Sequence, residues 1–76
     1  MIYTFHVAVT RVAGFWRVRC PALESYGSIT VGDTREEVLT HIYSALVMIL
    51  ENLKDEGTAI PPDHAFPGGI PITVEL

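Results

Sequence analysis

Three histidines have the most versatile chemistry in this chain, since imidazole can bind a metal or move a proton near neutral pH. His6 falls in a stretch with the alternation of a strand, His41 in a stretch with helical periodicity, and His64 in a proline-rich segment. No two of them have the spacing of a zinc-binding helix, in which two histidines lie four residues apart. We therefore predict no metal site and no cofactor.

Adjacent carboxylates occur at Glu36-Glu37 and at Asp55-Glu56. Neighbouring residues on a helix point in different directions, so neither pair forms an acid–base couple. No serine has a histidine at a spacing that would indicate a nucleophile and its base. Cys20 is the only cysteine, which rules out an internal disulfide, and it fits a small strand residue. These observations predict that the chain is not an enzyme.

One short segment combines large aromatic side chains with cations. Phe15, Trp16, Arg17 and Arg19 follow one another closely, and aromatic and arginine side chains are enriched at binding hot spots. Trp16 shares a strand face with Val18, which favours a place in the core beneath a helix. We predict that these four residues contact a partner, with a core position as the alternative for Trp16.

A single long helix is expected between Gly32 and Gly57. Thr34 is a suitable N-cap, and Glu37 lies where a capping box places its acid. Gly57 supplies the left-handed residue that ends a helix. The apolar positions recur at steps of three and four residues: Val38, Leu39, Ile42, Tyr43, Ala45, Leu46, Val47, Ile49, Leu50 and Leu53.

The apolar face of this helix is broader than a chain of 76 residues, 49% of them hydrophobic, can cover by itself. Val47 and Met48 widen the face furthest. We predict that they form a self-association surface and that the chain is a homo-oligomer, a dimer or a tetramer.

Strand patterns occupy residues 2–12, 15–20, 28–31 and 70–76, with loops at 22–27 and 58–69. The connection at Ala13-Gly14 is short enough for an antiparallel hairpin. A right-handed crossover through the helix would leave the third and fourth strands parallel. Pro71 places the last strand at an edge. We predict one α+β domain over residues 1–76, of order β-β-β-α-β: a four-stranded mixed sheet (3-2-1-4) with one long helix on one face.

The net charge of −4 disfavours binding to nucleic acid and suits docking to a basic protein. The N-terminal residues lack the features of a signal peptide, and no apolar run is long enough to cross a membrane. The expected location is cytoplasmic.

The sequence resembles the HicB-like antitoxin family over nearly the whole chain. The resemblance is carried by Gly14 before Phe15-Trp16-Arg17-Val18, Cys20-Pro21-Ala22-Leu23, the run from Gly27 to Glu37, and the later Ala45, Leu50, Leu53, Gly57 and Ile60-Pro61. It implies a partial RNase H-like fold and a module that neutralises a small mRNA-cleaving HicA-like toxin by masking its surface. The loop after Pro21 is longer than the family pattern, and a C-terminal DNA-binding segment is not expected.

Two further interpretations stay open. The chain could be an orphan module that self-associates without a toxin partner. The chain could instead be a residual nuclease or a small-molecule enzyme, although the first two strands carry no carboxylate to hold the metal of an RNase H-type enzyme.

Overall fold

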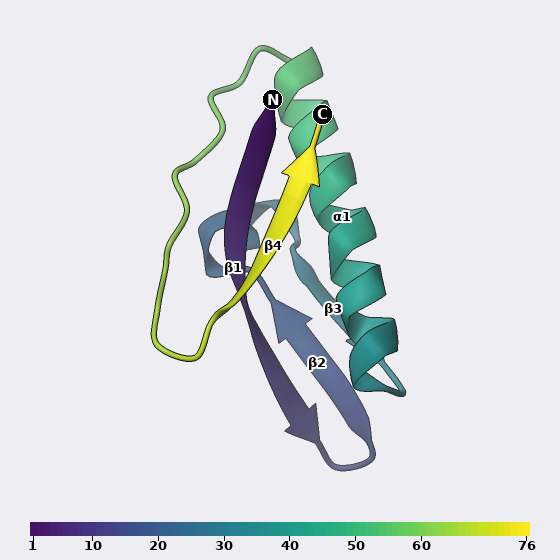
Figure 1. Cartoon of the computed structure of the whole chain (residues 1–76). Coiled ribbons are helices and arrows are strands. Elements are labelled where there is room, and N and C mark those ends of the chain that lie inside the picture. The colour runs from purple at the N-terminus through teal and green to yellow at the C-terminus, as the bar shows by residue number, and fades with distance from the viewer.

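The strand β1 (Ile2–Val12) runs through the middle of the sheet and pairs with a different strand along each half of its length (Figure 1). The computed structural model describes residues 1–76. The other elements are β2 (Phe15–Arg19), the 3₁₀ helix η1 (Pro21–Tyr26), β3 (Ile29–Gly32), α1 (Arg35–Asp55) and β4 (Ile70–Glu75). The strand order is β3-β2-β1-β4, so the predicted α+β class, strand order and single long helix are confirmed.

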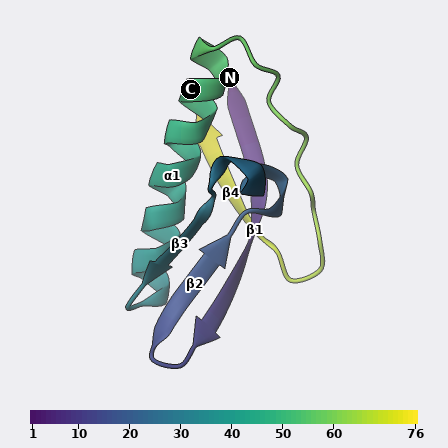
Figure 2. The ribbon, with the colours of Figure 1, turned by 180° about the vertical axis from the view of Figure 1, so that it is seen from behind.

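Strand alternation decides which side chains enter the core. Phe5 and Val7 of β1, Val18 of β2 and Val74 of β4 are buried, whereas their sequence neighbours are more exposed. They share the core with one stripe of α1: Val38, Ile42, Leu46, Leu50 and Leu53. The sheet and the helix thus form two layers, and the sheet face turned away from α1 (the outer face) has no second helix over it (Figures 1 and 2).

Both ends of α1 carry the predicted caps. Thr34 Oγ1 accepts the Glu37 N–H at 3.0 Å, and the Glu37 carboxylate accepts the N–H of Asp33 at 3.4 Å instead of that of Thr34. Gly57, with φ of 68°, ends the helix, and the N–H of Thr58 bonds the Leu53 carbonyl. This pattern is a Schellman motif, which satisfies the carbonyls that the helix leaves unpaired.

The prediction of a mixed sheet was wrong, because every strand pair is antiparallel. α1 spans about 30 Å and leaves the chain at one end of the molecule. The segment 58–69 then returns beside β1 as far as the middle of that strand, where β4 begins with Ile70 paired to Val7 (Figure 1). β4 therefore runs in the same general direction as α1, and a parallel crossover from β3 does not form.

The loop predicted at 22–27 is for the most part the 3₁₀ helix η1. Leu23 of this helix is fully buried, and Gly27, with φ of 83°, ends it. The buried hydroxyl of Ser28 donates to the Cys20 carbonyl at 2.8 Å, which joins the two ends of η1. Leu23, with φ of −120° and ψ of 17°, kinks the 3₁₀ helix and places its apolar side chain in the core. No helix combines the length and apolar character of a membrane span.

Candidate functional site

The outer face of β2 and β3 carries an exposed group of apolar and cationic side chains. Arg17 pairs with Val31 and Arg19 with Ile29, while Phe15 continues the same face of β2. Ile29 is 56% exposed, Val31 52% and Phe15 37%. We call these five residues the outer patch. Exposed apolar side chains beside arginine are typical of protein-binding surfaces.

Trp16 does not belong to the outer patch. Its side chain lies on the face turned toward α1, where it is half-buried and packs against the core. The guanidinium of Arg11 lies 5.8 Å from the centre of its ring, a cation–π contact across the hairpin. The core position that the shared face with Val18 favours for Trp16 is thus the one it occupies, and strand alternation separates Trp16 from Phe15, Arg17 and Arg19.

The two arginines of the outer patch differ in their electrostatic state. Arg19 forms an ion pair with Glu24 at 2.5 Å, whereas Arg17 has no carboxylate within ion-pair distance. Together with Glu24 and Ile29 they line a shallow cavity of about 300 Å³. Arg17 is therefore the cation available to a partner, and the apolar neighbours supply the surface to be desolvated.

Sequence reasoning missed Ile29 and Val31. They alternate with Thr30 and Gly32 in a strand of four residues. This alternation shows that the strand has two faces, but it does not show which face packs against the helix. Gly32, buried beside Val38 of α1, shows that the even-numbered face of β3 packs against the helix.

The two residues predicted for self-association occupy different environments. Val47 is partly buried and packs against the core, whereas Met48 is 66% exposed. Successive residues of a helix are separated by about 100° around its axis, so a partner would meet the two from different angles.

His6 and His41 make contacts in separate parts of the molecule. The backbone N–H of His6 donates to Asp63 Oδ1 at 2.8 Å, and its ring Nδ1 lies 2.5 Å from Asp63 Oδ2. His41 Nδ1 lies 2.8 Å from the carbonyl oxygen of Val31. No group of three or more histidine, cysteine, aspartate or glutamate residues is placed to hold a metal ion.

Two titratable groups have shifted pKa values. Partial desolvation raises the pKa of Asp63, but the hydrogen bonds from His6 and the charge of its ring outweigh this effect and hold that pKa below the ordinary value. Burial raises the pKa of the Cys20 thiol, and the side chain is fully inaccessible. A protonated, buried thiol is a poor nucleophile.

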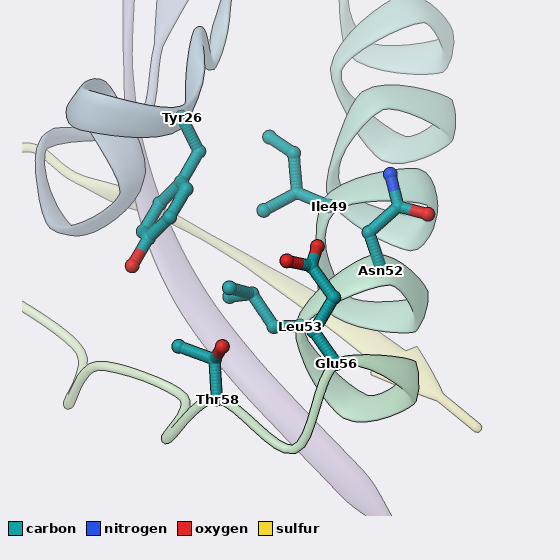
Figure 3. Close-up of a pocket in the computed structure, with 6 residues that line it drawn as sticks. All are labelled: Tyr26, Ile49, Asn52, Leu53, Glu56 and Thr58. Carbon is teal, nitrogen blue, oxygen red and sulfur yellow. The ribbon is translucent and has the colours of Figure 1, made fainter.

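A cavity of about 290 Å³ lies between η1 and the last turns of α1 (Figure 3). It is lined by Tyr26, Ile49, Asn52, Leu53, Glu56 and Thr58. Glu56 is its only charged residue, so the lining presents no nucleophile paired with a base. The cavity is a packing gap of mixed polarity.

The fold defines the class of this protein as a small two-layer α+β domain with an antiparallel sheet and an outer face that no helix covers. Compared with known proteins, the chain matches no family model, no curated protein and no solved structure.

Proposed function

We propose that this chain is a HicB-like, antitoxin-type module with a partial RNase H-like fold that binds a small, basic, mRNA-cleaving HicA-like toxin and masks its surface. The observation that carries the proposal is the run from Cys20 to Glu37, which holds the most specific part of the resemblance. In the structure this run is one connected unit: Ser28 bonds Cys20, and Thr34 caps α1. The buried and capping residues of this run build the domain, whereas its Ile29 and Val31 stay exposed.

The outer patch is the surface that we assign to the toxin. Its apolar members are exposed and lie together, and burial of such a group provides most of the free energy of a protein–protein contact. The net charge of −4 attracts a basic partner at long range, while Arg17 selects a local acidic or aromatic group on it. The net charge thus speeds the encounter with the toxin, and the local contacts of the outer patch decide which surface of the toxin is bound.

Two variants test binding of the toxin. Each places a glutamate at an exposed apolar position, one in the sheet and the other on α1. We expect Val31→Glu, in the outer patch, to weaken the complex with a HicA-like toxin at least about tenfold. Met48→Glu, on α1, is the matched control and should leave the affinity within about twofold. Isothermal titration calorimetry gives the affinities, and protection of a model mRNA from the toxin gives the activity.

The proposal fails if the wild-type protein forms no complex with the toxin at low salt. It also fails in its assignment of the surface if Met48→Glu abolishes binding and Val31→Glu does not. Thermal unfolding of both variants shows that a loss of binding is not a loss of folding.

A second candidate function is an orphan module that self-associates without a toxin. It is favoured by one observation: β4 is a terminal strand of the sheet and pairs only with β1. The adjacent open reading frame distinguishes the two functions, since a toxin–antitoxin pair requires a short basic neighbour.

A further inference from the structure

The sheet has two edges, and they differ in how many backbone groups are free. At β3, the Val31 carbonyl lies 2.8 Å from His41 Nδ1, and the Ile29 N–H donates to the Gly27 carbonyl at 2.9 Å. The edge of β3 is thus partly occupied by its own chain. β4 is the other terminal strand, and it is longer by two residues.

The orientation of the backbone groups of β4 follows from its first pairing. The N-terminal amine of Met1 donates to the Leu76 carbonyl at 2.8 Å, and the N–H of Leu76 donates to the Met1 carbonyl at 2.9 Å. Such doubly bonded pairs recur at every second residue of an antiparallel ladder. Ile72 and Val74 therefore exchange hydrogen bonds with β1.

The intervening residues, Pro71, Thr73 and Glu75, must point their backbone groups away from the sheet. The same rule predicts that the N–H of His6 points away from β4, and that N–H is indeed bound by Asp63. None of the ten backbone hydrogen bonds outside the helix and the ladders involves Thr73 or Glu75. The edge of β4 thus offers unpaired donors and acceptors to another strand.

We propose that a second copy of this chain pairs with β4 antiparallel, about a two-fold axis at Thr73, so that the two sheets become one continuous sheet. The Thr73 N–H of each copy then donates to the Thr73 carbonyl of the other. The Glu75 N–H of each donates to the Pro71 carbonyl of the other. No existing hydrogen bond has to break, and the two Glu75 side chains stay well apart.

The side chains of β4 favour this arrangement. Ile70, Ile72 and Leu76 lie on the helix-facing side and are only partly buried. The two-fold pairing places Ile70 opposite Leu76 and Ile72 opposite Val74 of the other copy. Apolar side chains at the edge therefore gain cross-strand neighbours of the same kind.

The groove beside this edge carries charges of both signs. It has a volume of about 370 Å³ and is lined by Glu51, Lys54, Asp55, Glu75 and Leu76. The two-fold axis at Thr73 places the grooves of the two copies at opposite ends of the new strand pair, so the two sets of like charges stay apart. Val47, one turn before Glu51, lies on the same stripe of α1. The register matches the strand to itself, with Ile70 opposite Leu76 and Ile72 opposite Val74, and this favours a second copy over an unrelated strand.

This inference does not rest on toxin binding, because β4 and the outer patch are different parts of the molecule. A dimer without toxin affinity would leave it intact. Toxin binding by a monomer would overturn it and leave the proposed function standing.

Proline at position 73 tests the pairing, because it removes an N–H that β1 does not use. Sedimentation equilibrium should show a reversible wild-type dimer and a Thr73→Pro dimer weaker by about 30-fold, since two intermolecular hydrogen bonds are lost. Thr73→Val, which keeps the N–H and removes the hydroxyl bonded to Thr4, should dimerise like the wild type. A wild-type monomer up to about 1 mM, or an unweakened Thr73→Pro dimer, would overturn the proposal.

Amide hydrogen exchange of the wild-type protein tests the pairing of β4 between two copies even if Thr73→Pro does not fold. The amides of Thr73 and Glu75 should become protected as the protein concentration rises, whereas that of Val74, already bonded to β1, should change little. Equal exchange of Thr73 and Glu75 at all concentrations would rule out this interface.

Discussion

At the scale of single residues, the clearest link between distant parts of the chain is the contact of His6 with Asp63. Strand β2 ends before it reaches His6, so the N–H of His6 has no partner in the sheet. The Asp63 carboxylate accepts this hydrogen bond and so ties the segment 58–69 to β1. One carboxylate thus replaces a missing strand partner.

The lowered pKa of Asp63 gives a pH-dependent contribution to stability. Its pKa is lower in the folded protein than the ordinary value of 3.8, so the stabilisation is complete above that value and is lost as the pH falls through the folded pKa. We expect Asp63→Asn to lower the free energy of unfolding by about 1 kcal/mol or less at neutral pH. The difference from wild type should disappear in acid.

Urea denaturation of both proteins from about pH 6 to about pH 2.5 measures this difference. Asp55→Asn, at an exposed position on α1, is the control and has no such contact. A difference that stays constant down to the lowest pH would mean that ionisation of Asp63 contributes nothing.

At the scale of elements, the junction of β3 and α1 depends on the absence of one side chain. A Cβ atom at Gly32 would lie 3.0 Å from the backbone nitrogen and 3.2 Å from the Cα of Val38. Both are backbone atoms of the first turns of α1, so they cannot move aside without shifting the helix. The glycine therefore sets how closely α1 approaches β3.

Gly32→Ala is expected to destabilise the fold by about 1–3 kcal/mol, the usual effect of overpacking. Val31→Ala, an exposed change on the same strand, should have an effect of less than about 0.5 kcal/mol. Thermal unfolding of the two variants measures both effects. A Gly32→Ala protein as stable as Val31→Ala would show that α1 adjusts freely to the added methyl group.

At the scale of the whole molecule, the core is small. Only 13 of 76 residues are buried, and chains of this size have little stability to spare. Pairing of β4 between two copies would add hydrogen bonds and apolar burial that the single chain lacks. Folding and association would then be linked, because a second copy binds only the folded chain and so stabilises the folded state, as a ligand does.

This linkage predicts a melting temperature that depends on protein concentration. We expect the wild-type value to rise by about 2–5 °C for each tenfold increase in concentration. Thr73→Pro should show a much smaller dependence over the same range. Differential scanning calorimetry of both proteins at several concentrations provides the measurement, and a wild-type value independent of concentration would contradict the linkage.

Much of the architecture follows from local sequence patterns alone. Alternation in residues 2–12 predicts the two faces of β1, and Thr34 and Gly57 predict where α1 begins and ends. Pro71 correctly predicts an edge strand. These signals are reliable because each depends on the conformation of neighbouring residues, which the sequence specifies directly.

Tertiary structure alone decided the direction of β4 and the composition of the outer patch. The direction depends on the path of the segment 58–69, which Asp63 ties to a strand 57 residues away in sequence. The patch depends on which face of β3 the helix covers, and this choice leaves Ile29 and Val31 exposed beside Arg17. Local patterns give each strand two distinct faces and each helix its ends. Only the packing of distant segments selects the face that is buried and the edge that stays free.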